Sequence, residues 1–281
     1  ASRSKMNSIL VACEMNAEGT AVIGKPVLIY DGNDGVNHTV EGPKLYKRDG
    51  WYYIFAPAGG VEQGWQLAMR SKSIYGPYEV RRVMEQGDTD INGPHQGGWV
   101  ETPQGESWFV HFQDKAMYGR IIHLNPMVWH DGWPVIGEDK DGDGCGNPVR
   151  RHAKPKVNGK HPKTTPVESD EFNSRQLGLQ WEWHANYQDT YGFTSDLGYM
   201  RLYGHVLSEG FVNFWEVPNL LLQKFPAEAF TATTKLKVSA KADGQQSGLI
   251  VMGWDYGYLA AVKKGEDFVL RQVTCKDAEQ G

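Results

Sequence analysis

Short runs of apolar and aromatic residues recur in the first half of the chain, separated by polar turn residues. Residues 45–48 (LYKR) and 51–55 (WYYIF) are separated by Asp49-Gly50. An Asp-Gly pair supplies the positive φ angles that a tight hairpin requires, so this stretch predicts a β-hairpin. Residues 99–112 predict a second hairpin with a Pro-Gln-Gly-Glu turn. No stretch shows helical periodicity, and the pattern therefore predicts an all-β protein.

The two hairpins belong to a weak internal repeat. Glu41-Gly42-Pro43 precedes the first hairpin, and Asn92-Gly93-Pro94 precedes the second 51 positions later. A period of about 50 residues with four strands per unit is typical of β-propeller blades. Residues 8–30 predict part of a third blade. A propeller needs at least about four blades to close, so we expect only part of one here, about its last three blades.

The composition changes at residues 139–168, where Gly, Asp, Lys and Pro dominate and apolar residues nearly vanish. This stretch predicts a linker between a partial propeller at residues 1–138 and a second domain at residues 169–281. The second domain is expected to be an incomplete β-sandwich, with strands at residues 179–183, 199–202, 231–238, 248–252 and 258–262. The chain begins without a Met, and we expect it to be cut at both ends.

Composition narrows the possible partners. The 281 residues are 40% apolar and 22% charged, with a net charge of −5. That charge argues against a protein that follows a nucleic-acid backbone, which needs a basic face. No apolar run approaches the roughly 18–20 residues of a membrane span. Cys13, Cys145 and Cys275 are too far apart for a disulfide framework or a zinc knuckle.

Glu41 is the first candidate for chemistry, because it lies where the first strand of a blade would begin. The inner strands of a propeller line its axial funnel, so a carboxylate there would be partly desolvated. Desolvation favours the protonated form, which a general acid needs. A surface Glu in a turn is the alternative that the pattern alone leaves open.

Longer motifs support the functional alternative. Residues 38–79, HTVEGPKLYKRDGWYYIFAPAGGVEQGWQLAMRSKSIYGPYE, resemble the blade of family 43 glycoside hydrolases that carries the catalytic acid. Residues 92–137 resemble its next blade. Residues 177–187 (LGLQWEWHANY) and 198–206 (GYMRLYGHV) resemble the concanavalin-like jelly-roll sandwich fused to many family 43 xylosidases. The most similar group combines β-xylosidases and α-L-arabinofuranosidases.

The resemblance implies a five-bladed propeller and a role for each matched residue. Glu41 would be the general acid, and Arg120 would reach into the sugar subsite. His95 would help to hold a calcium ion or a water cluster at the axis, and the neighbouring Gln96 would contact the substrate. Trp65 would either stack on the sugar or pack inside the blade. Calcium is thus the one cofactor implied, with no organic cofactor.

The implied reaction is inverting, exo-acting hydrolysis of a hemicellulose oligosaccharide or polysaccharide, with the acid and a base about 6.5–9.5 Å apart. In the family, the base and a second Asp precede the matched region. Four aspartates, Asp34, Asp88, Asp90 and Asp114, match neither position, so we expect the chain alone to be inactive. A non-catalytic carbohydrate-binding protein is the alternative. An extracytoplasmic location, periplasmic or secreted, is favoured, with the compartment left open.

Three further motifs remain. Residues 139–144 (DKDGDG) resemble the start of an EF-hand loop, but Arg150 stands where a bidentate Glu is required, and a solvated turn is the alternative to a calcium site. Asn37-His38-Thr39 is a glycosylation sequon. The tryptophans of the second domain are either sugar platforms or core residues: Trp181, Trp183, Trp215 and Trp254.

Overall fold

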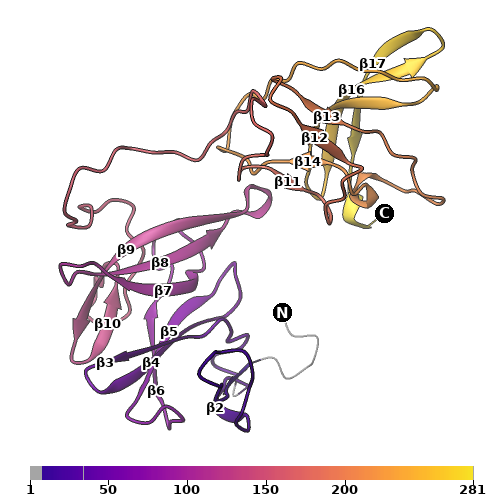
Figure 1. The fold of residues 1–281 in the computed structure, drawn as a ribbon. Helices are drawn as coiled ribbons and strands as arrows, with labels where there is room; N and C mark the ends of the chain where they lie inside the picture. Colours follow the sequence, from indigo (N-terminus) through magenta and orange to yellow (C-terminus); the bar gives the residue numbers. More distant parts are fainter. Residues whose placement is uncertain (1–7, 34, 281) are drawn as a thin grey trace. The chain divides into compact units, whose positions relative to one another are not determined.

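The structure, a computed structural model, describes residues 8–33 and 35–280 and contains two compact units, Ala1–Lys160 and His161–Gly281. In both units the described residues form strands and three short 3₁₀ helices, η1 (Ala116–Tyr118), η2 (Phe214–Glu216) and η3 (Ala278–Gln280), which confirms the all-β prediction (Figure 1). Within the described residues, no helix combines the length and the apolar composition needed to cross a membrane.

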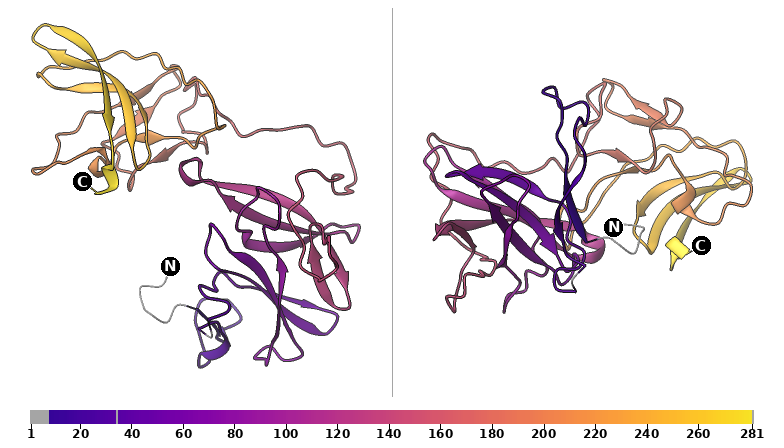
Figure 2. Two further views of the ribbon diagram at one scale, coloured as in Figure 1. Left: turned by 180° about the vertical axis from the view of Figure 1, so that it is seen from behind. Right: turned by 90° about the horizontal axis from the view of Figure 1, so that it is seen from below.

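The first unit contains two four-stranded antiparallel sheets in which each strand pairs with the next along the chain (Figure 2). One sheet contains β3 (Lys44–Arg48), β4 (Trp51–Ala58), β5 (Trp65–Ser71) and β6 (Glu79–Met84). The other contains β7 (His95–Glu101), β8 (Ser107–Asp114), β9 (Arg120–His130) and β10 (Trp133–Ile136). This meander is the arrangement of a propeller blade, and both predicted hairpins are confirmed as β3–β4 and β7–β8.

The first hairpin turn has the expected backbone. Asp49 and Gly50 have φ angles of 49° and 74°, the left-handed pair that a two-residue turn needs. A third, smaller sheet consists of β1 (Ile9–Ala12) and β2 (Val27–Asp31). This pair lies where a third blade was predicted, and the number of blades in the complete propeller stays a prediction.

Strand β4 is buried on both faces, because neighbouring sheets cover it from each side. Tyr53 and Phe55 face one apolar cluster together with Phe109 and Met127 of the next sheet. Ile54, in contrast, belongs to a second cluster that includes residues of β1 and β2. Because side chains alternate along a strand, one strand supplies the core between each pair of sheets.

Residues 139–151 of the predicted linker are part of the first unit. Glu138 and Asn147 form a bridge with each other, and Gly146 pairs with Met84 at the end of β6. Backbone hydrogen bonds of Gly146 with Val83 and Glu85 therefore hold the first part of the predicted linker against the end of β6. The division between the two compact units falls at Lys160.

The second unit contains three small antiparallel sheets. They pair β11 (Glu182–Trp183) with β14 (Leu221–Leu222), β12 (Gly192–Thr194) with β13 (Met200–Leu202), and β15 (Gln246–Val251) with β16 (Tyr256–Lys264) and β17 (Asp267–Cys275). The predicted strand at residues 231–238 is wrong, because that stretch has no strand pairing and is largely exposed. Alternation in Thr, Lys and Leu gives it β propensity, but a strand also needs a partner for its backbone groups.

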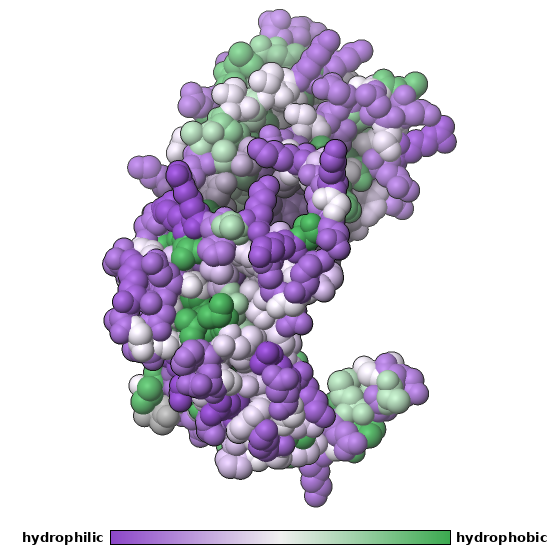
Figure 3. All heavy atoms as spheres, turned by 90° about the vertical axis from the view of Figure 1, so that its left-hand side faces the viewer, coloured by the Kyte–Doolittle hydropathy of each residue, from purple (hydrophilic) through white to green (hydrophobic). Residues whose placement is uncertain are grey.

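Polar side chains cover most of the face drawn in Figure 3, interrupted by small apolar groups. Some of the exposed apolar residues of the first unit lie on one side of β9, where Ile122 is 67% exposed and Val128 is 62% exposed. This side of the β7–β10 sheet therefore has less apolar cover than the side that faces β4.

Arg70 connects the two large sheets of the first unit. Its guanidinium lies 4.8 Å from the ring centre of Trp51 and 4.3 Å from that of Trp133, and it donates to the carbonyl of Asp131. The side chain is only 16% exposed and forms an ion pair with Glu79. Partial burial between two rings strengthens a cation–π contact.

We expect Arg70→Ala to lower the free energy of unfolding by about 3 kcal/mol, because it removes charged hydrogen bonds and two ring contacts at once. Urea unfolding followed by tryptophan fluorescence measures the loss. Arg81→Ala is the matched control, since exposed Arg81 covers the other side of Trp133 at 4.4 Å. A loss for Arg70→Ala no larger than that of the control would contradict the bridging role.

Candidate active site

Glu41 lies in a strained turn just before β3. Thr39 has a φ of 57°, which is rare for a β-branched residue, and its amide donates to Ser8 Oγ at 2.8 Å. The Glu41 amide donates to the carbonyl of Pro57 at 3.1 Å, which keeps the turn beside β4. Gly42 has a φ of 52°, and a Cβ added there would overlap the side-chain amide of Gln96. Glycine is therefore needed both for the backbone and for the close approach.

The carboxylate of Glu41 points at the first residues of β7. Its Oε1 lies 3.3 Å from His95 Nε2 and accepts a hydrogen bond of 3.1 Å from Gln96 Nε2. Gln96 itself has a φ of 51°, at an irregularity in the β7–β8 pairing. The Glu41 side chain is 41% exposed, so protein covers one side of the carboxylate and the other remains open.

His95 is buried and favours the neutral form. Loss of solvent lowers its pKa, the Glu41 carboxylate opposes this change, and the positive charges of Arg120 and Lys44 add to it. Its Nδ1 is buried without a hydrogen-bond partner among the described residues. One proton between Nε2 and Oε1 is enough for this contact, and it can be carried by either group.

Arg120 lies on the same side of the molecule as this pair. The short helix η1 reverses the chain after β8 and leads into β9, whose first residue is Arg120. Its guanidinium lies 4.7 Å from the ring centre of Phe112, and that ring lies 5.9 Å from the ring of His95. Arg120 is exposed, which leaves its planar donors free to meet a ligand.

Trp65 is held in the packing of the first sheet. Its Nε1 donates to Asn37 Oδ1 at 3.1 Å, and its ring packs against the cluster that contains Leu10 and Val40. The guanidinium of Arg82 lies over the ring at 4.0 Å. Trp65 is therefore packed inside the blade, one of the two positions expected for it. The other four predicted site residues lie together: Glu41, His95, Gln96 and Arg120.

The residues around His95 do not fit a calcium site by themselves. Calcium takes six to eight oxygen ligands, whereas Glu41 is the one carboxylate that the described residues place against His95. Lys44 and Arg120 add positive charge close by. The buried, unpartnered Nδ1 of His95 suits a water better than a hard cation.

Two polar residues near the site carried no signal as isolated positions in the sequence. Lys44 donates to the carbonyl of Gly42 at 3.2 Å, and burial lowers its pKa. Gln66 is fully buried with its Oε1 unpartnered, next to Gly97. Lys44 also lies beside Gly98 and Gln66 beside Gly97, both on β7, and only the period-2 alternation after Pro43 could have placed Lys44 on the side of the site.

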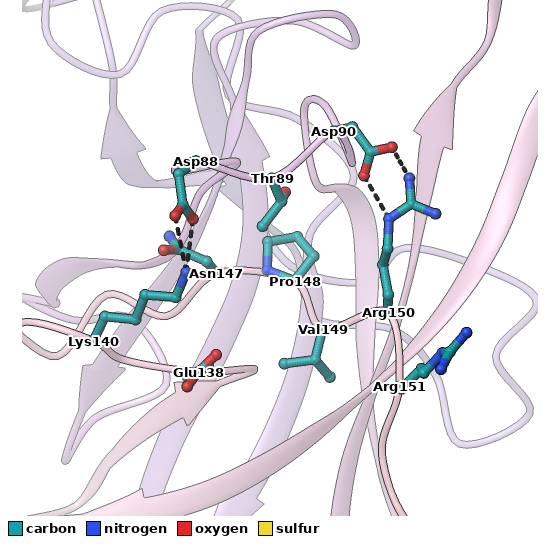
Figure 4. A pocket seen from close by; sticks show the side chains of 10 residues that line it. All are labelled: Asp88, Thr89, Asp90, Glu138, Lys140, Asn147, Pro148, Val149, Arg150 and Arg151. Carbon is teal, nitrogen blue, oxygen red and sulfur yellow. Dashed lines mark hydrogen bonds and ion pairs between the residues drawn. The ribbon is translucent and has the colours of Figure 1, made fainter.

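The remaining aspartates are occupied elsewhere. Asp88 pairs with Lys140, which lowers the pKa of Asp88, and Asp90 pairs with Arg150. Figure 4 shows both ion pairs at a pocket of about 500 Å³ whose floor includes Pro148 and Val149. Asp114 accepts from the amide of Ala116, and Asp34 lies outside the described residues.

The EF-hand-like loop brings its three acids together. Ligand atoms of Asp139, Asp141 and Asp143 lie within 4.8 Å of one another. The two carboxylate oxygens of Asp139, however, already accept from the amides of Gly142 and Gly144. These contacts are those of a solvated turn, and calcium binding there stays a prediction.

Three of the four tryptophans of the second unit have partners within it. Trp181 donates to Asp170, Trp215 donates to the carbonyl of Gly253, and Trp183 packs against Tyr191. Trp254, in contrast, is 63% exposed. Three of these rings are thus packed as core residues would be, whereas the ring of Trp254 is largely exposed to solvent.

A buried histidine supports the strand that leads to Arg120. His111 on β8 is 1% exposed, accepts from Asn125 Nδ2 at 2.7 Å and donates through Nδ1 to the carbonyl of Phe112. Burial lowers the pKa of His111 to about 4. The folded protein therefore keeps this imidazole neutral at pH values where the unfolded chain protonates it.

We expect His111 to weaken the fold in mild acid. Below the unfolded pKa of about 6.5 the unfolded chain takes up a proton that the folded state refuses until about pH 4, so stability falls as the pH falls between these values. Lowering the pH from 7 to 5 should cost roughly 2 kcal/mol through this group. Urea unfolding at both pH values measures it, and His111→Gln should flatten the dependence; an unchanged slope would contradict this account.

We expect Glu41→Gln to lower the pKa of His95 further, because it removes the negative charge that stabilises the imidazolium. Titration of the His95 ring protons by NMR measures the change. Glu62→Gln, on an exposed loop residue, is the charge-matched control and should leave His95 nearly unchanged. A rise of the His95 pKa in Glu41→Gln would show that the two side chains do not interact as the geometry indicates.

Comparison with known proteins follows the two units. Residues 1–134 match the model of glycosyl hydrolases family 43, and residues 169–281 match the beta xylosidase C-terminal concanavalin A-like domain. A protein of Xylanibacter ruminicola named "Putative beta-xylosidase" is 38% identical over 87% of this chain and 44% of its own length. A "Beta-xylosidase" of Formosa agariphila is 34% identical over 88% of this chain and 47% of its own length.

The fold agrees with these matches. A crystal structure of the GH43 protein BlXynB from Bacillus licheniformis superposes with a TM-score of 0.74 at 25% identity, covering 94% of this chain and 54% of that one. The chain spans about half the length of the curated relatives it matches. The propeller-type sheets, the C-terminal domain and the sequence matches agree, and the chain belongs to glycosyl hydrolase family 43, with a C-terminal concanavalin A-like domain.

Proposed function

We propose that this chain is part of an inverting, exo-acting glycosidase that releases xylose or arabinose from hemicellulose, with Glu41 as the general acid. The contact of the half-exposed Glu41 carboxylate with His95 and Gln96 carries the proposal. A general acid must be held at one angle to the glycosidic oxygen and must remain open to substrate. Two fixed neighbours on a single carboxylate oxygen leave the second oxygen of Glu41 free for that role.

Arg120 supplies the second part of the proposed site. Its guanidinium is supported by the Phe112 ring and offers planar donors beside the His95–Glu41 pair. Sugar hydroxyls need such fixed donors, and we assign Arg120 to the subsite of the released sugar. Gln96 contacts Glu41, so its contribution to substrate binding would come through the position of the acid.

The general base is proposed to come from a part of the protein outside these residues. Asp88 and Asp90 are each paired with a cation, and Asp114 caps a turn. A carboxylate that activates water needs to face the acid across the sugar, about 6.5–9.5 Å away. These three acids are already committed to other contacts.

We expect the 281-residue chain to hydrolyse neither aryl xylosides nor aryl arabinofuranosides, and the longer protein that contains it to hydrolyse at least one of them. In the longer protein, Glu41→Gln should reduce kcat by about 10²–10⁴-fold on substrates with poor leaving groups, because proton donation is lost. Initial-rate assays measure this loss, and NMR of the first product should show inversion at the anomeric carbon.

Asp90→Asn serves as the control, because it removes an exposed carboxylate that is paired with Arg150. Hydrolysis by the 281-residue chain that disappears in Glu41→Gln would contradict the proposed source of the base. Sugar binding without turnover in the longer protein would instead favour the carbohydrate-binding alternative.

A further inference from the structure

Asn92 occupies the position in the second repeat that Glu41 occupies in the first. Both residues precede a Gly-Pro pair, and both glycines adopt the left-handed conformation, with φ angles of 52° at Gly42 and 43° at Gly93. The two turns therefore share a backbone conformation at the glycine but differ in the residue that precedes it. Both the Nδ2 and the Oδ1 of Asn92 form hydrogen bonds within the protein, which indicates a role different from that of Glu41.

The Asn92 amide connects two segments. Its Nδ2 donates to the carbonyl of Glu62 at 3.1 Å, on the loop between β4 and β5. Its Oδ1 accepts from Gln113 Nε2 at 3.0 Å, on β8. One short side chain thus holds a loop of the first sheet to a strand of the second.

Gln113 fixes the orientation of this contact. It is 4% exposed, and its Nε2 also donates to the carbonyl of Asp90 at 3.0 Å. Its Oε1 lies 2.9 Å from His123 Nε2 on β9, which completes the hydrogen bonding of the buried amide. A buried amide with all these partners has one favourable orientation, so Gln113 presents a donor to Asn92.

The loop that Asn92 holds lies directly behind the candidate site. A Cβ added to Gly93 would overlap the carbonyl of Val61, so the turn and the loop are in contact. A Cβ added to Gly64, at the other end of the loop, would lie 3.1 Å from His95 Nδ1. His95 is therefore held between this loop and the Glu41 carboxylate.

We propose that Asn92, oriented by Gln113, is a positioning residue for the general acid: it fixes the loop at residues 59–64 behind His95 and so holds the imidazole against Glu41. The inference rests on the proposed function of Glu41. Asn92 contacts neither Glu41 nor, by this account, the substrate, and it acts through the loop and His95.

The test uses two aryl β-xylosides in the active protein that contains these residues. A dinitrophenyl leaving group departs without a proton, whereas a methoxyphenyl leaving group needs the general acid. Asn92→Ala should reduce kcat/KM on the methoxyphenyl substrate by about 10-fold and change the dinitrophenyl rate by less than about 2-fold, because misplacement of an acid affects only the step that uses its proton.

Two variants and one control sharpen the result. Asn92→Asp keeps the acceptor for Gln113 and nearly the same shape but loses the donor to Glu62, so it should show the same selective loss without a large change in Tm. Gln113→Leu should reproduce that loss. Asn219→Ala removes a comparable amide-to-carbonyl bond in the second unit, to Tyr203, and should leave both rates unchanged.

The outcomes separate the two proposals. Equal losses on both substrates in Asn92→Asp, beside a selective loss in Glu41→Gln, would overturn the positioning role and leave Glu41 as the acid. An unchanged methoxyphenyl rate in Asn92→Asp would overturn it as well. Equal losses in Glu41→Gln itself would overturn the proposed function and this inference together.

Discussion

The first unit depends on the way two neighbouring sheets interlock at the turns that begin their first strands. Gly42 packs against the side chain of Gln96 in the second sheet, and Gly93 packs against the backbone of Val61 in the first. Each contact is too close for a Cβ, and each needs a backbone that other residues adopt only with strain. Because the contacts run in both directions, neither turn can move without disturbing the other sheet. The carboxylate of Glu41 and the imidazole of His95 meet at this junction.

The hairpins and the repeat could be predicted because their signals are local. Asp49-Gly50 fixes a two-residue turn by its backbone preference, and the aromatic and apolar run at residues 51–55 continues into a strand buried on both faces. The convergence of Glu41 with His95 followed from a family resemblance. Distances between residues 54 positions apart depend on how sheets pack, which no local pattern contains.

Other features depend on partners that the sequence does not name. Residues 231–238 have strand propensity, yet they remain unpaired, because propensity does not provide a neighbouring strand. For Trp65 the sequence left stacking on a sugar and packing in the blade open. In the structure Asn37 accepts from its Nε1 and Arg82 lies over its ring, and a sugar contact stays a prediction. Residues 139–151 have a linker composition and still pack within the first unit through Arg150 and Asn147. In each case, a contact between distant segments decided the outcome.

The electrostatics of the site favour a neutral imidazole beside Glu41 rather than an ion pair. Burial disfavours the imidazolium of His95, and Arg120 and Lys44 oppose it further, so the neutral ring is the form that the site favours. A neutral imidazole with its proton on Nε2 donates to a carboxylate, and the other tautomer, with its proton on Nδ1, accepts from a carboxylic acid through Nε2, with the same positions of the heavy atoms. The arrangement therefore holds Glu41 in place in both of its protonation states. This suits the proposed role of Glu41, because a general acid gives up a proton and regains it in every cycle, and a cationic imidazolium in direct contact with it would favour the ionised state.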